Sequence, residues 1–278
     1  MKRRHFIEIS DERWCPQTIK DAVTDYCRFV LAVAKPYQSI APTLARALRK
    51  TGARRVLDLC SGASGPWIWL QPLLSTMGAE VAVCLTDQYP NTMAFERARR
   101  LGHGAISFQP KPVDATHVPA ELTGFRTIFM AFHHFRPDQA RAILSDATRK
   151  GEGIAVVECG KRNIVLMLLA MLDTPGRVLL ATPFIRPFRW SRLFWTYLVP
   201  VVPVVMMFDT VVSCLRVYTV EELHELTAGL DGYHWDIGVI WSKMPPIPNT
   251  YLIGVPVESE DPAASSPLPA NPSKVSET

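Results

Sequence analysis

The chain has 278 residues, of which 48% are hydrophobic and 20% charged, and its formal net charge is +4. This length suits one α/β domain with additions or two small domains, and it is ample for a sizeable core. The basic residues are scattered and form no stripe, which argues against a nucleic-acid partner. The six cysteines include no CxxC pair, so we expect reduced core thiols and no metal site.

Two helices are predicted near the N-terminus. Apolar residues recur at helical spacing over residues 17–34, and Pro36 ends this pattern. A second helix is expected over residues 40–50, before Gly52. We expect residues 1–52 to form a helical cap. The basic start MKRRHFIEIS lacks the long apolar segment of a signal peptide, so a cytoplasmic location is expected.

From residue 53 the pattern changes to short apolar segments that alternate with amphipathic ones. The strand-like segments are RVLDLC, VAVCLTD, AISFQP, TIFMAF and GIAVVE, and helices are expected near residues 67–77, 91–101 and 137–150. Continuous apolar strands alternating with helices indicate a parallel sheet that is covered on both faces. We therefore predict an α/β fold, doubly wound, with this core over residues 53–160.

The pattern resumes after an apolar insertion at residues 161–216. A helix over residues 220–229 and the strands YHWDIGVIW and TYLIGVP would complete a seven-stranded, mostly parallel sheet within residues 217–257. The connection SKMPPIPN is rich in turn formers and predicts that the last two strands are antiparallel. Residues 258–278 cannot bury a core and are predicted to be a disordered tail.

Acidic residues follow three successive predicted strands. Asp58 closes the first strand, with Gly62 and Gly65 in the loop behind it, Asp87 ends the second, and Asp114 follows the third. Since the carboxyl ends of parallel strands meet at one edge, we expect the three carboxylates to line one rim. Glycines there let the backbone approach a ligand, and an acid after the second strand can accept both hydroxyls of a ribose.

The segments VLDLCSGASG, LTD, VDAT and TIFMAFHHF, followed by GIAVVE, resemble the class I, Rossmann-like S-adenosylmethionine (SAM)-dependent methyltransferases, including a bacterial subgroup. The resemblance covers residues 54–158 and implies SAM as the cofactor. It departs from the family pattern at Cys60 and Ser64, where glycines are usual. The resemblance implies that the loop Cys60–Gly65, with Ser61 and Gly62, passes beneath the methionine part of SAM, near Asp58. It also implies that Asp87 holds the ribose hydroxyls, and that Asp114 and Ala115 adjoin the adenine.

Two histidines follow the fourth strand directly, in FHHFRPD. Methyl transfer mainly requires alignment and exclusion of water, and a base is needed only when the nucleophile keeps its proton at neutral pH. His133 and His134 are candidates for that base, and Glu158, at the end of the fifth strand, is a candidate for a carboxylate facing the nucleophile. The alternatives are that the histidines cap the loop or pack, and that Glu158 is a solvated charge.

The apolar insertion is nearly long enough to span a bilayer over residues 193–215. Pro200, Pro203 and Asp209 argue against a simple span, since an aspartate at bilayer depth costs about 3 kcal/mol. A single crossing would also separate the last two strands from the sheet. We expect a helical lid, either packed within the protein or partly immersed in a membrane surface, because arginines and aromatic residues interleave over residues 186–197 as in interfacial anchors.

The sequence therefore predicts a methyltransferase that acts on a hydrophobic small molecule or lipid-like acceptor. Tyr197, Asp209 and Arg216 are polar residues within the insertion that are expected to orient the acceptor, unless an Asp–Arg pair joins lid to core. One alternative is a non-catalytic SAM-binding protein whose insertion docks on a membrane or partner. Another is a nicotinamide-dependent oxidoreductase, although CSGASG is no GxGxxG. The oligomeric state stays open.

Overall fold

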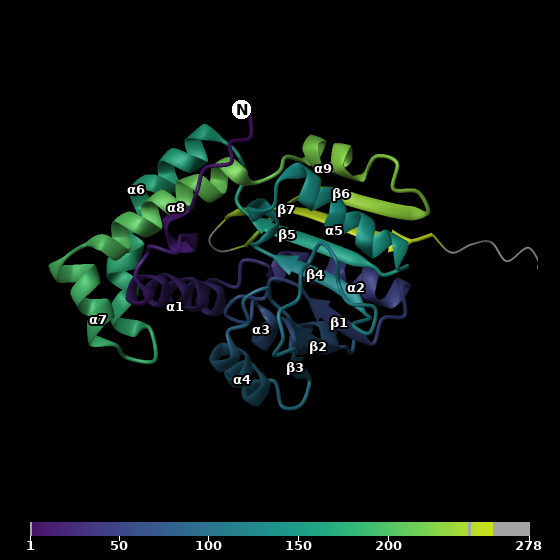
Figure 1. The fold of residues 1–278 in the computed structure, drawn as a ribbon, viewed down its shortest axis with the longest axis horizontal. Helices are drawn as coiled ribbons and strands as arrows, with labels where there is room; N and C mark the ends of the chain where they lie inside the picture. The colour runs from purple at the N-terminus through teal and green to yellow at the C-terminus, as the bar shows by residue number, and fades with distance from the viewer. Residues whose placement is uncertain (1, 244–245, 258–278) are drawn as a thin grey trace, which may run out of the picture.

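The computed structural model describes residues 2–243 and 246–257, and a seven-stranded sheet lies at its centre (Figure 1). The spatial order is β3-β2-β1-β4-β5-β7-β6, where β1 to β5 run parallel and β7 is antiparallel to both neighbours. This order confirms the predicted mostly parallel sheet and its antiparallel final pair. The strands are β1 (Arg55–Asp58), β2 (Ala82–Leu85), β3 (Ile106–Phe108), β4 (Phe125–Phe129), β5 (Ile154–Cys159), β6 (Tyr233–Trp241) and β7 (Pro248–Pro256).

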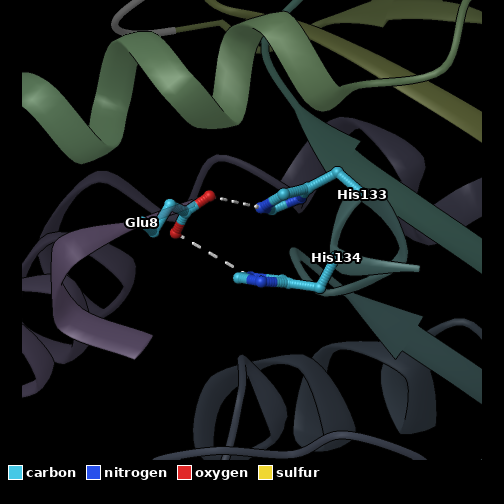
Figure 2. Close-up of side chains that lie close together, drawn as sticks. All are labelled: Glu8, His133 and His134. Atoms are coloured by element: carbon cyan, nitrogen blue, oxygen red, sulfur yellow. Dashed lines mark ion pairs between the residues drawn. The ribbon is translucent and has the colours of Figure 1, made fainter. Parts of the chain in front are cut away.

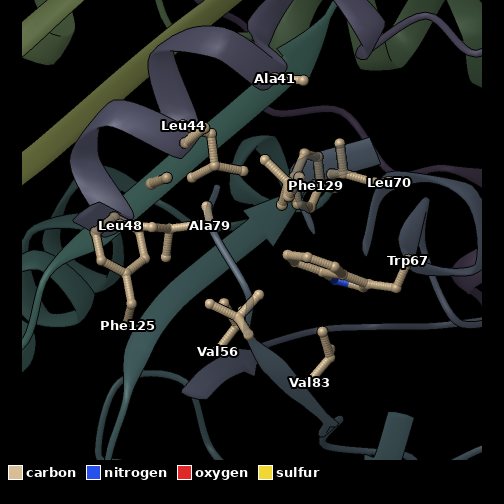
Figure 3. Packing of buried hydrophobic residues seen from close by; sticks show 14 of the residues in the cluster. Ala41, Leu44, Leu48, Val56, Trp67, Leu70, Ala79, Val83, Phe125 and Phe129 are labelled. Atoms are coloured by element: carbon tan, nitrogen blue, oxygen red, sulfur yellow. The ribbon is translucent and has the colours of Figure 1, made fainter. Parts of the chain in front are cut away.

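Helices cover both faces of the sheet, as the alternating pattern predicts. One face carries α2 (Ala41–Lys50), α3 (Trp67–Thr76) and α4 (Thr92–Leu101), and the other carries α5 (Pro137–Arg149) and α9 (Val220–Thr227). Figure 3 shows how the first layer packs: Leu44 and Leu48 of α2 and Trp67 of α3 meet Val56 and Phe129 of the strands, and all five are buried. Burial of such side chains stabilises the fold by roughly 1.5–3 kcal/mol each.

The insertion forms a helical arm that projects from one end of the sheet (Figure 1). We call residues 164–216 the arm; it consists of α6 (Ile164–Ala181), α7 (Trp190–Leu193), a π-helical turn (Phe194–Leu198) and α8 (Val201–Arg216). This arrangement confirms a helical insertion after the fifth strand.

The first long helix, α1 (Gln17–Ala34), packs on the arm and α2 packs on the sheet, although both lie within the predicted cap. A buried cluster joins Ile19 and Val23 of α1 to the arm. Asp25 of α1 forms an ion pair with Arg192 of the arm at 2.6 Å. The proposed domain boundaries stay predictions, and the predicted disordered tail, residues 258–278, lies outside the described residues.

Candidate functional site

The carboxyl ends of β1 to β3 are tied together at one edge of the sheet. The backbone N–H of Thr86 donates to the carbonyl oxygen of Asp58 at 2.8 Å, which joins the ends of β1 and β2. The N–H of Val113 donates to the carbonyl oxygen of Asp87 at 2.9 Å, which holds the segment after β3 beside the segment after β2. Asp114 follows immediately, so the three predicted acidic segments share one rim.

The loop after β1 has a glycine-like backbone even where it lacks glycine. Cys60 has φ 57° and Ser64 has φ 89°, in the left-handed region that Gly62 and Gly65 also occupy, both at 52°. A non-glycine residue there costs roughly 1–2 kcal/mol. A Cβ added to Gly62 would meet no heavy atom within 4 Å, so the loop faces open space at that point. The loop therefore keeps the shape that close approach of a ligand requires.

Asp58 lies beneath this loop and is only 1% exposed. Its Oδ2 accepts from the hydroxyl of Ser61 and its Oδ1 from the hydroxyl of Thr127, both at 2.6 Å. Burial raises the pKa of Asp58 to about 6, although these two hydrogen bonds act to lower it. Asp58 therefore fixes the position of Ser61 in the loop. That Asp58 lies near the methionine part of SAM stays a prediction.

Asp87 stands at the rim and is half-buried. Its Oδ2 accepts from the N–H of Gly62 at 2.8 Å, and its Oδ1 accepts from the N–H of Tyr89 at 2.8 Å. A carboxylate offers about four acceptor positions, so Asp87 can take further donors while it holds the loop.

Asp114 is exposed, and the neighbouring Ala115 is buried. Oδ1 of Asp114 accepts from the backbone and the hydroxyl of Thr116 at 2.8 and 2.7 Å. Burial raises the pKa of the Cys60 thiol, and the negative charges of Asp87, Asp58 and Asp114 raise it further. The three carboxylates are thus within electrostatic reach of one point in the loop.

A cluster of charged side chains surrounds His133, which is 2% exposed (Figure 2). Its Nδ1 lies 2.6 Å from Oε2 of Glu158, and its backbone N–H donates to Oε1 at 3.1 Å. Its Nε2 lies 3.5 Å from Glu8, an ion-pair distance and too long for a good hydrogen bond. Burial alone would lower the pKa of His133, but Glu158 and Glu8 together raise it to about 10. His133 is therefore a buried imidazolium at neutral pH.

His134 stacks on His133 with ring centroids 4.3 Å apart, and its side chain is 33% exposed. Its Nδ1 lies 3.0 Å from Asp11 and 3.2 Å from Arg216. One ligand atom each from Glu8, His133 and His134 lie within 4.8 Å of one another, as a metal site requires. However, the guanidinium of Arg216 lies 3.0 Å from Glu8 and already supplies a cation. We assign the cluster as an ion-pair network.

The N-terminal segment contributes to this network in a way that sequence reasoning missed. Glu8 is buried, and although burial raises its pKa, His133, His134 and Arg216 lower it to about 2. Glu8 and Asp11 precede the histidines by more than 120 residues. No spacing in the sequence relates them, and an acid between two isoleucines reads as an exposed charge.

The three residues predicted to orient the methyl acceptor, Tyr197, Asp209 and Arg216, make contacts with different parts of the chain. Asp209 accepts from the backbone N–H groups of Ile9 and Ser10 at 2.7 and 3.1 Å, and Arg216 pairs with Glu8. Both therefore hold the N-terminal segment, and neither forms the alternative Asp–Arg pair with the other. The hydroxyl of Tyr197 donates to the carbonyl oxygen of Leu179 within the arm. The structure does not bring Tyr197 to the histidines.

A groove of about 350 Å³ adjoins the loop. It is lined by Ser64 and Gly65, by Phe29 of α1, by Trp69 of α3 and by Phe184 of the arm, among others. A larger groove of about 560 Å³ lies at the opposite edge, around the amino ends of β1 and β4, and contains none of the predicted site residues. The smaller groove is the one that connects the loop to the arm.

No protein-family model matches the sequence, and no curated protein matches it. Among solved structures, the chain is similar to an O-methyltransferase (NcsB1) from neocarzinostatin biosynthesis in complex with S-adenosyl-L-homocysteine and 1,4-dihydroxy-2-naphthoic acid, with a TM-score of 0.50 and 14% identity over 86% of this chain and 59% of that chain. The chain is more weakly similar to the citrinin polyketide synthase CMeT domain, with a TM-score of 0.45 and 13% identity over 73% of this chain and 46% of that chain. It is also weakly similar to the methyltransferase domain of bacterial CtHen1, with a TM-score of 0.46 and 13% identity over 78% of this chain and 98% of that chain.

The chain spans about three fifths of the NcsB1 structure and less than half of the polyketide synthase structure. Its strand order and the NcsB1 similarity show the Rossmann-like fold of the class I SAM-dependent methyltransferases, as the sequence resemblance implies. The antiparallel β7, inserted between β5 and β6, departs from the common dinucleotide-binding order of six parallel strands.

Proposed function

We propose that this protein is a SAM-dependent methyltransferase that acts on a hydrophobic small molecule or lipid-like acceptor. The observation that carries the proposal is the rim at the carboxyl ends of β1 to β3, where a loop with a glycine-like backbone is held by Asp87 and the buried Asp58 and faces open space at Gly62. When bound, SAM supplies a methyl group on a sulfonium. Asp87 would hold the ribose hydroxyls, and Asp114 beside Ala115 would accept from the adenine amino group.

The residues around the histidines suit an acceptor that carries a hydroxyl group. In the tautomer with its proton on Nδ1, His134 donates to Asp11, and its Nε2, which lies 4.0 Å from Oε2 of Glu8, would take the acceptor's proton. Asp11 then stabilises the imidazolium that forms. His133 is already protonated and buried between Glu8 and Glu158, so it would position the loop that carries His134.

Apolar surroundings support a hydrophobic acceptor. The groove beside the loop is lined by Phe29, Trp69 and Phe184 and by aliphatic side chains, and three arginines also line it: Arg28, Arg97 and Arg186. The NcsB1 structure contains 1,4-dihydroxy-2-naphthoic acid, an aromatic molecule with hydroxyl groups. We therefore favour an aromatic acceptor that carries a hydroxyl group, whose ring would contact the aromatic side chains of this groove.

The first test is calorimetry with SAM on the wild type and on the Asp87→Ala variant, with Asp231→Ala as a matched exposed control. We expect Asp87→Ala to lower the affinity at least about tenfold, because the ribose hydroxyls lose a charged acceptor, and the control to bind like the wild type. Unchanged affinity would reject the assignment of Asp87. Transfer of labelled methyl groups to a panel of hydroxylated lipids and aromatics then tests turnover, and stabilisation by NAD in place of SAM would favour an oxidoreductase.

A further inference from the structure

The outer face of α6 is apolar and has no protein partner among the described residues. Seven large side chains along it are exposed: Ile164, Val165, Leu168, Leu169, Leu172, Leu179 and Leu180. At about 100° per residue they fall within an arc of about 160°, along a helix about 27 Å long. The segment Ile164–Phe184 is long and apolar enough to cross a membrane, and only 11% of its most apolar window is buried. A core helix of the same composition would be mostly buried.

The tip of the arm extends this apolar surface with aromatic residues. Phe184, Phe188, Trp190 and Tyr197 are all exposed, and Trp190 is 78% exposed. Arg186 stands exposed among them. Trp and Tyr beside arginine are the residues that prefer the boundary between acyl chains and headgroups.

The acidic residues of the arm do not oppose contact with lipid. Asp209 points inward, where it accepts from the backbone of the N-terminal segment. The cost of burying an aspartate at bilayer depth therefore does not apply to the outer face. Asp173 pairs with Arg177 at 2.8 Å. Of the seven Lys and Arg residues across residues 161–216, five form ion pairs with acidic residues, so contact with lipid would be mainly apolar.

The connections of the arm determine how it can meet a membrane. It leaves the sheet after β5 and returns to it before α9 and β6, so both of its ends lie on the same side. The pair formed by residues 190–198 and 201–216 is bent by 79° and is not one straight span. We propose that the arm lies in one leaflet of a phospholipid bilayer, with the outer face of α6 and the aromatic tip immersed among the acyl chains.

Docking would connect the leaflet with the loop after β1. Phe184 and Arg186 of the arm line the same groove as Ser64 and Gly65. An acceptor dissolved in the leaflet would therefore enter the groove at the arm and meet the loop at its other side. This route rests on the proposed function, whereas docking itself does not.

Vesicle flotation of the full chain with phosphatidylcholine vesicles tests the proposal. The arm variant combines Leu169→Asp, Leu172→Asp and Leu180→Asp, all on exposed side chains. The control combines three apolar sites of similar exposure outside the arm: Val33→Asp, Met93→Asp and Trp241→Asp. We expect the wild type and the control to float, also in 0.5 M NaCl, because the contact is mainly apolar. We expect the arm variant to bind about 1,000-fold more weakly, since each of the three leucines contributes about tenfold.

Several results would overturn docking. They are a wild type that stays with the lipid-free fraction, an arm variant that floats like the control, or a lipid-free dimer that the three aspartates dissociate, which would make a second copy of the chain the occupant of this face. Calorimetry with SAM on all three proteins separates this proposal from the proposed function. Flotation without SAM binding would reject the methyltransferase and keep the docking surface.

Discussion

The buried pair of His133 and Glu158 makes a quantitative prediction about stability. In Glu158→Gln the side chain keeps its shape but retains only one acceptor oxygen. In the wild type the carboxylate accepts from two donors, the backbone N–H of His133 at 3.1 Å and its Nδ1 at 2.6 Å. One donor would then face an NH₂ group, and the imidazolium would lose one of its two negative partners.

The magnitude follows from burial. Removing one partner of a buried ion pair costs about 3–5 kcal/mol, and we expect the lower end, about 3 kcal/mol, because Glu8 stays 3.5 Å from Nε2. At roughly 2–4 °C per kcal/mol this lowers the melting temperature by about 6–12 °C. The folded pKa of His133, about 10, lies above its ordinary value of 6.5. Its contribution is therefore complete below pH 6.5 and is lost as the pH rises through 10.

The assay is thermal unfolding followed by circular dichroism at pH 6, 7.5, 9 and 10.5. The exposed Glu121→Gln serves as the control, since it removes the same charge at the surface. We expect the gap between wild type and Glu158→Gln to be widest at pH 6 and to narrow steeply by pH 10.5. A gap below about 1 °C at pH 7.5, or one of equal size at pH 10.5, would refute the charged state assigned to His133.

Two further predictions concern catalysis and the loop. His134→Gln should lower kcat about 100-fold or more with the Kd for SAM unchanged, and unaltered turnover of a hydroxylated acceptor would remove His134 as the base. Gly62→Ala should lower stability by about 1 kcal/mol, because its φ of 52° disfavours a side chain although space for one is open. Equal denaturant midpoints for this variant and the wild type would contradict the strain argument.

Much of the fold was predictable because its signals are local. The strands are apolar runs of the right length, and the helix predicted over residues 17–34 occupies those residues in the structure. The common rim of Asp58, Asp87 and Asp114 could also be predicted, since parallel strands bring their carboxyl ends together whatever their side chains are. These inferences require only periodicity and chain direction.

The partners of each surface could not be predicted in the same way. Periodicity shows that α1 has an apolar face, but not that this face meets the arm while α2 covers the sheet. Similarly, Asp209 reads as a charge within an apolar segment, and only the structure shows that it binds the backbone of residues 9 and 10. Contacts between segments some 200 residues apart leave no local pattern.

The N-terminal segment connects the proposed docking surface to the proposed chemistry. Glu8 contacts His133 and Arg216, and Arg216 is the last residue of α8. Arg3 donates to the carbonyl oxygens of Arg216 and His133 at 2.6 and 3.0 Å. The base of the arm and the histidine loop are therefore held by the same short segment. A membrane that fixes the arm would also restrict α8 and, through Glu8, the charged cluster around His133, so docking and acceptor positioning are expected to be energetically coupled.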